Sequence, residues 1–103
     1  MAAINQSALA LLKADLGYYD AAIPADLEEY LRGLLASAQR RIVRAGISLT
    51  AGDVDDDLFL AMYAAWLYRK RIDGSRKPQM LQDEIRNRQV SDALADDELE
   101  DVP

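Results

Sequence analysis

The sequence predicts an all-α fold: a small bundle of about four helices around a central apolar helix, followed by a flexible acidic C-terminal tail. Apolar residues recur at helical spacing in several segments, whereas the alternation typical of a half-buried strand is almost absent. Gly, Pro and Asp separate these segments. The 103 residues, 50% hydrophobic and 29% charged, indicate one globular domain with a thin core.

The first two predicted helices are amphipathic. The first covers about residues 5–16 and ends before Gly17. The second runs from about Pro24 to Ala45, before Gly46. Its apolar stripe consists of Leu27, Tyr30, Leu31, Leu34, Leu35, Ala38 and Ile42. Because a glycine inside a helix costs roughly 1 kcal/mol relative to alanine, we expect close helix packing at Gly33.

The third predicted helix, from Asp53 or Val54 to about Ile72, is the centre of the bundle. Its eleven residues from Leu58 to Tyr68 are all apolar or aromatic, which indicates a helix surrounded by other helices. Four aromatic side chains at helical spacing favour core and interface packing over a ligand box or a base-stacking platform. They are Phe59, Tyr63, Trp66 and Tyr68.

Four aspartates mark the start of this helix: Asp53, Asp55, Asp56 and Asp57. Negative charge and short polar side chains stabilise a helix N-terminus. A calcium loop is the alternative, but the segment lacks the glycine and the closing bidentate glutamate at the required offsets. The cluster therefore predicts helix capping.

A short fourth helix is predicted from about Pro78 to Arg88. Residues 1–90 contain all 12 bases and 12 of the 18 acids, whereas residues 91–103 carry six acids and no base. The formal charge of -6 thus belongs to the C-terminal segment. We expect residues 1–90 to form the helical domain and residues 91–103 to form an acidic tail that is mobile until it docks.

The composition argues against catalysis. The chain has no cysteine and no histidine, so disulfides, thiolate metal sites and the commonest neutral-pH general base are excluded. No activated nucleophile, Gly-rich phosphate loop or metal-ligand spacing is visible. We therefore expect a non-enzymatic protein without cofactor or metal.

The N-terminus has no basic region and no apolar run approaches the roughly 18 residues of a spanning helix, so we expect a soluble cytoplasmic protein without membrane contact.

A basic cluster follows the apolar helix, where seven of the 12 bases lie within 20 residues. Its first five members are Arg69, Lys70, Arg71, Arg76 and Lys77. Three roles remain open: stabilising the helix end and its solubility, contacting nucleic-acid phosphates, and contacting the acidic surface of a subunit or partner. The zero net charge of residues 1–90 argues against a tight, sequence-specific duplex binder.

Four stretches, taken in order, resemble the small head-tail connector, or portal adaptor, proteins of long-tailed bacteriophages and prophages. ALLKADLG is similar to the family's opening helix with its leucine-glycine stop, and DLEEYLRGLLASAQRRI to its long helix. DDDLFLAMYAAWLYRKR resembles the acid-capped third helix, and KPQMLQDEIRNRQVS the closing segment with its asparagine-arginine pair. The similarity covers about residues 7–91. The polar QVS after Arg88, where members often continue with an apolar residue, and the long acidic extension depart from the family pattern.

The resemblance implies a structural virion protein that forms a homo-oligomeric ring beneath the portal protein, extends the DNA channel and docks a neck or tail-completion protein. Double-stranded DNA would pass without sequence-specific binding. The protein would occupy the bacterial host cytoplasm during assembly and the virion neck afterwards. Candidate subunit or portal contacts are Arg40, Arg41, Arg44, Arg69, Lys70, Arg71, Arg76 and Lys77. Candidate lumen or rim acids are Asp53, Asp55, Asp56 and Asp57.

Two other classes of function remain open. One is a small helical DNA-associated regulator or packaging component that uses the basic cluster on phosphates. The other is a generic protein-interaction module, such as an antitoxin-like partner.

Overall fold

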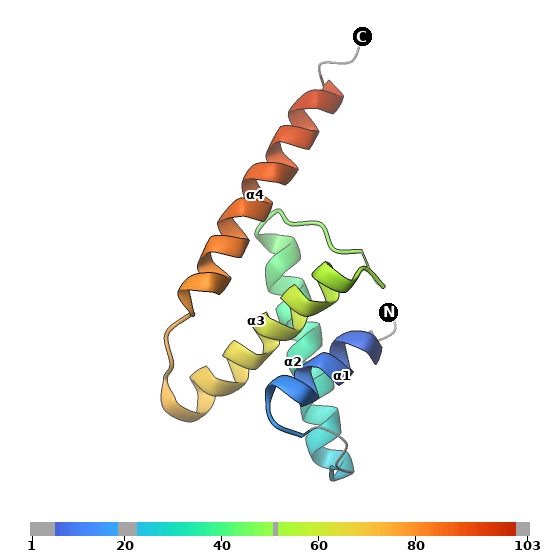
Figure 1. Cartoon of the computed structure of the whole chain (residues 1–103), viewed down its shortest axis with the longest axis vertical. Helices are drawn as coiled ribbons and strands as arrows, with labels where there is room; N and C mark the ends of the chain where they lie inside the picture. The colour runs from blue at the N-terminus through green and yellow to red at the C-terminus, as the bar shows by residue number, and fades with distance from the viewer. Residues whose placement is uncertain (1–5, 19–22, 51, 101–103) are drawn as a thin grey trace.

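The structure is a computed structural model that describes residues 6–18, 23–50 and 52–100, with side chains described as far as Asp92. These residues form four α-helices and no strand: α1 (Gln6–Asp15), α2 (Ala25–Arg44), α3 (Val54–Asp73) and α4 (Gln79–Glu100). The predicted all-α bundle is therefore confirmed. Figure 1 shows α1 and α3 lying over α2, with the C-terminal part of α4 projecting beyond the other helices.

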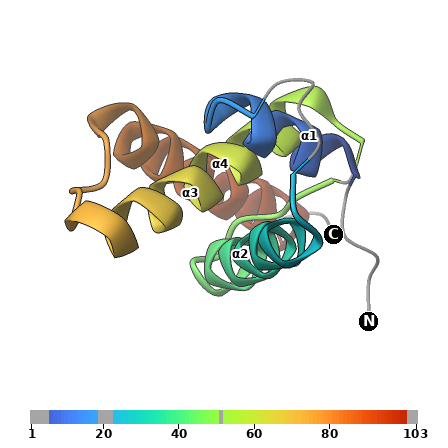
Figure 2. The same ribbon diagram turned by 90° about the horizontal axis from the view of Figure 1, so that it is seen from below.

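Helix α3 is the central element, as predicted. Among the described residues it packs against each of the other three helices, whereas α4 packs against no helix except α3. In Figure 2, α2 lies on one side of the molecule, below the other three helices. The eleven-residue apolar run is thus explained by a helix that must bury most of its circumference.

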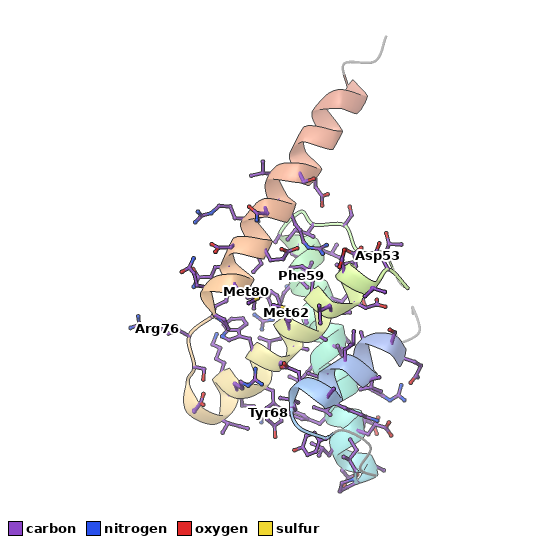
Figure 3. All side chains as sticks on the ribbon, viewed as in Figure 1. Asp53, Phe59, Met62, Tyr68, Arg76 and Met80 are labelled. Atoms are coloured by element: carbon purple, nitrogen blue, oxygen red, sulfur yellow. The ribbon has the colours of Figure 1, made fainter. Side chains whose placement is uncertain are left out.

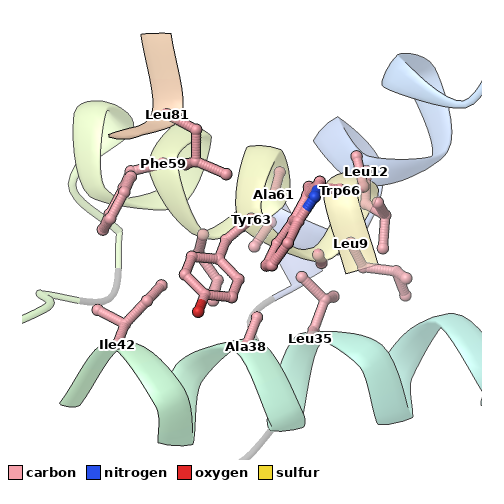
Figure 4. Packing of buried hydrophobic residues seen from close by; sticks show 14 of the residues in the cluster. Leu9, Leu12, Leu35, Ala38, Ile42, Phe59, Ala61, Tyr63, Trp66 and Leu81 are labelled. Atoms are coloured by element: carbon pink, nitrogen blue, oxygen red, sulfur yellow. The ribbon is translucent and has the colours of Figure 1, made fainter. Parts of the chain in front are cut away.

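The core joins side chains from all four helices. The largest fully buried side chains are Leu12, Leu31, Leu35, Ile42, Phe59 and Leu81. Phe59 lies near Ile42 of α2 and Leu81 of α4 (Figure 4). Tyr63 and Trp66 are each 8% exposed and pack edge to face with ring centroids 5.5 Å apart. The aromatic residues therefore serve the core, as their spacing predicted.

The ends of α3 carry the expected signals. The Asp53 carboxylate accepts a hydrogen bond from the Asp56 N–H at 3.1 Å, which satisfies one of the free donors of the first turn. Gly74 adopts a left-handed conformation with φ of 70° and donates its N–H to the Lys70 carbonyl at 2.8 Å. This left-handed conformation ends the helix, and glycine adopts it readily because it has no Cβ.

Two expectations about the helices were wrong. Gly33 makes no close helix contact, because nothing lies within 4 Å of the position that a Cβ would occupy and the residue is exposed. Helix α4 does not end near Arg88 but continues to Glu100. Residues 89–100 contain no Gly or Pro to stop it, and they include the helix formers Ala, Leu and Glu. The mobility of residues 91–103 stays a prediction, and residues 101–103 lie outside the described ranges.

Candidate functional site

Four of the five bases between Arg69 and Lys77 contact other parts of the chain. The Arg69 guanidinium lies 3.2 Å from the Asp15 carboxylate and also donates to the Asp15 carbonyl at 3.1 Å, which joins the ends of α3 and α1. The Arg71 guanidinium lies 5.5 Å from the centroid of the Tyr30 ring on α2. Both arginines therefore help to hold the C-terminal half of α3 against its neighbours.

Trp66 organises the connection between α3 and α4. Its Nε1 donates to the Ser75 carbonyl at 3.2 Å. The ammonium groups of Lys70 and Lys77 lie 5.0 Å and 4.8 Å from the ring centroid. Among the described residues, only Arg76 of the five bases makes no such contact. These contacts support the role of the cluster in stabilising the end of α3, and its contact with a partner stays a prediction.

The four aspartates have four different environments. Asp53 caps α3, and Asp55 is exposed. Asp56 accepts a hydrogen bond from the Thr50 N–H at 2.8 Å and pairs with the Arg88 guanidinium. Asp57 is only 2% exposed. Asp53 and Asp55 are the two of the four whose side chains are exposed, and a place for the four aspartates at a lumen or rim stays a prediction.

Arg88, named in the sequence only as part of the asparagine-arginine pair, makes several contacts within the chain. Its guanidinium pairs with Asp56, lies 2.7 Å from a Glu84 oxygen, and sits 4.5 Å from the centroid of the Phe59 ring. The Arg88 and Asp56 side chains are each 17% exposed. Burial alone raises the pKa of Asp56, but hydrogen bonds from Arg88 and the Thr50 N–H outweigh it and lower that pKa. In the sequence, the i,i+4 spacing of Glu84 and Arg88 was the one local indication of these contacts.

Two more residues of α4 bind the segment that follows α2. Gln89 donates from Nε2 to the Ala45 carbonyl at 2.9 Å, which satisfies one of the free acceptors at the end of α2. The Asp92 carboxylate accepts a hydrogen bond from the Ser48 N–H at 2.8 Å. These two residues attach the middle of α4 to the connection between α2 and α3, and Arg88 attaches it to the first turn of α3.

Three exposed arginines lie at the C-terminal end of α2, where positive charge is favourable. Arg40, Arg41 and Arg44 surround a hollow of about 330 Å³ together with Ser37, whose hydroxyl accepts from Arg41 Nε at 3.4 Å. None of the three pairs with a carboxylate of the described residues. We call Arg40, Arg41 and Arg44, together with the adjacent Val43, the arginine patch. Val43 is 55% exposed.

An apolar groove of about 340 Å³ lies between α3 and α4. Leu58, Phe59, Met62 and Met80 supply its apolar lining, and Asp55, Glu84 and Arg88 supply its polar lining. Met80 is 71% exposed and Leu58 is 46% exposed. Figure 3 shows Met62 and Met80 close together between the two helices. We call this feature the α3–α4 groove; the sequence alone did not reveal it, because its lining comes from two helices whose relative placement no local pattern fixes.

The chain has no matching relative in the comparisons made with known proteins. No protein-family model matches it, and no curated protein and no solved structure is significantly similar to it. None of the described helices combines the length and the apolar character needed to cross a bilayer.

Proposed function

We propose that this chain is a structural head-tail connector subunit that assembles as a ring beneath a phage portal, extends the DNA channel and docks the next neck or tail component. The observation that carries the proposal is the order of its motifs. The four stretches that carry the resemblance lie in order on α1, α2, α3 and the first half of α4, which is consistent with the helices that the resemblance implies.

The exposed surfaces support an assembly role. A ring subunit needs two different lateral surfaces, because heterologous contacts are the ones that close a ring. The arginine patch lies on α2, and the α3–α4 groove lies on two other helices. The two surfaces differ in charge and in apolar character, so each can serve a different neighbour.

A DNA-associated function is the second candidate, and the arginine patch favours it. Arg40, Arg41 and Arg44 are exposed and free of intrachain carboxylates among the described residues, so they are open to phosphates. A contact to so few phosphates would give weak and strongly salt-dependent binding. The bases between Arg69 and Lys77 add less, since most of them already lie against aromatic rings or Asp15.

A binding assay with two baits separates these functions. The portal protein encoded in the same genome is immobilised on one surface and a random-sequence DNA duplex on another, and retention of the chain is measured at low and at high salt. The connector function predicts retention by the portal and little retention by DNA. Retention by DNA that falls steeply with salt, without retention by the portal, would replace the connector with the DNA-associated function.

A further inference from the structure

The α3–α4 groove is an apolar surface without a cover among the described residues. Val54, Leu58 and Met62 follow one another at intervals of four residues, so they form a stripe along one side of α3. Leu58 and Met62 of this stripe line the groove, and Met80 lines it from α4 and is 71% exposed. Exposed apolar surface with a polar rim marks interaction sites, and methionine side chains adapt to the shape of a partner.

The rim of the groove selects a basic partner. Asp55 and Glu84 are carboxylates at the groove, and Arg88 is the only base that lines it. The Arg88 guanidinium is already shared between Asp56 and Glu84. The rim therefore keeps net negative charge, and an occupant with positive charge around an apolar centre complements it.

The arginine patch offers positive charge beside an exposed apolar side chain. Val43 is 55% exposed, lies three residues after Arg40 and directly precedes Arg44. Arg40 and Val43 are i,i+3 neighbours on the helix surface, and Arg40 and Arg44 are i,i+4 neighbours, so the apolar side chain lies at the edge of a group of guanidiniums that no described carboxylate neutralises. Arginine is well suited to carboxylates at interfaces because its planar group can donate two parallel hydrogen bonds.

We propose that the α3–α4 groove of one copy of this chain binds the arginine patch of a second copy, with Val43 against Met80 and the arginines facing Asp55 and Glu84. The two surfaces come from different helices, so the contact is head-to-tail and leaves one free surface of each kind at the ends of a dimer. Further copies add in the same way. The inference rests on the proposed function, since it names the subunit contact of that ring.

Cysteine cross-linking tests the contact directly, because the natural chain has no cysteine. The variants Val43→Cys and Met80→Cys each carry one thiol on an exposed position. A disulfide requires Cα atoms within about 7 Å, so it reports close approach. Mixed under mild oxidation, the two variants should form a heterodisulfide about tenfold faster than either forms with Ile72→Cys, a 67% exposed position outside both surfaces. Equal rates for all pairs would overturn the proposal.

A charge exchange identifies the pairing. Adding Arg40→Glu and Arg44→Glu to the Val43→Cys variant should bring its cross-linking to Met80→Cys down to the Ile72→Cys level. Adding Asp55→Lys to the Met80→Cys variant should then restore part of the rate, because the exposed carboxylate at the rim becomes a base. Circular dichroism checks that each variant is folded. Rate loss without restoration would overturn the assigned pairing of the patch with the rim.

The outcomes for the contact and for the function are distinguishable. Selective cross-linking in a protein that ignores the portal would support this contact and remove the connector function. A ring on the portal with no preference for the Val43→Cys and Met80→Cys pair would support the connector function and overturn this contact.

Discussion

Arg88 of α4 pairs with Asp56 of α3 across 32 positions of sequence, with both side chains only 17% exposed. This pair matters because Leu81 is the only described side chain of α4 that is fully buried. Gln89 and Asp92 extend the same attachment to the segment after α2. The position of α4, and with it the α3–α4 groove, therefore depends on a few polar contacts, the buried Leu81 and the partly buried Ile85.

Replacing Arg88 with alanine should lower the free energy of unfolding by about 1–3 kcal/mol, because it leaves the half-buried Asp56 carboxylate without its charged donor. Urea denaturation followed by circular dichroism measures the change. The control is Arg86→Ala, an exposed base on the same helix, which should change that free energy by less than about 0.5 kcal/mol. Equal losses in the two variants would contradict a specific role for Arg88.

Stability should fall in acid, and Asp56 should account for part of the fall. The pKa of Asp56 is lowered from 3.8 in the folded chain, so the unfolded chain binds its proton first as the pH drops. The stabilisation is present above that ordinary pKa and is lost as the pH falls through the lower folded value. The hydrogen bond from Lys13 lowers the pKa of Glu28 and acts in the same direction. Urea midpoints measured from neutral pH down to about pH 3 should fall less steeply in Asp56→Asn than in the natural chain; parallel curves would refute the assignment.

Leu81 and Met80 are neighbours with opposite roles. Leu81 is 1% exposed, and Leu81→Ala should cost about 2–5 kcal/mol of unfolding free energy because it opens a cavity under α4. Met80 is 71% exposed, and Met80→Ala should change stability by less than about 0.5 kcal/mol. Thermal denaturation of each of the two single variants measures these changes. A similar loss of stability in both variants would mean that Met80 is a core residue and that the groove is closed in solution.

Gly33→Ala should stabilise the protein by about 0.5–1 kcal/mol, since alanine has the higher helix propensity and its methyl group meets open space. Gly74→Ala provides the contrast, because a Cβ is unfavourable at a φ of 70° and this substitution should destabilise the chain. Chemical denaturation of both variants measures these changes in the free energy of unfolding. A destabilised Gly33→Ala variant would restore the expectation of a close helix contact at that position.

Much of the fold was predictable because its signals are local. Apolar spacing located all four helices, Asp53 marked the start of α3, and Gly74 marked its end. The end of α4 was missed because a run of acids was taken as a solvated tail although no residue there stops a helix. The prediction at Gly33 was wrong because helix propensity gives the free-energy cost of a glycine but does not show why a glycine occupies that position.

The candidate surfaces were predictable only in part. Arg40, Arg41 and Arg44 lie on adjacent turns of one helix, so the sequence brought them together. The Arg88–Asp56 pair and the α3–α4 groove join residues of different helices, and their geometry depends on how α4 packs. The burial of Asp57 and the contact of Lys77 with Trp66 likewise follow from tertiary packing, whereas Lys70 and Trp66 are i,i+4 neighbours on α3.

Ring assembly is the central claim, and the molar mass in solution tests it most directly. Light scattering on a sizing column would be applied to the 11.5 kDa chain alone and after mixing with the portal protein of the same genome. The account predicts a ring-sized multiple of the chain mass, either in the free protein or bound to the portal. A species that keeps the mass of a single chain at high concentration and elutes separately from the portal would contradict it.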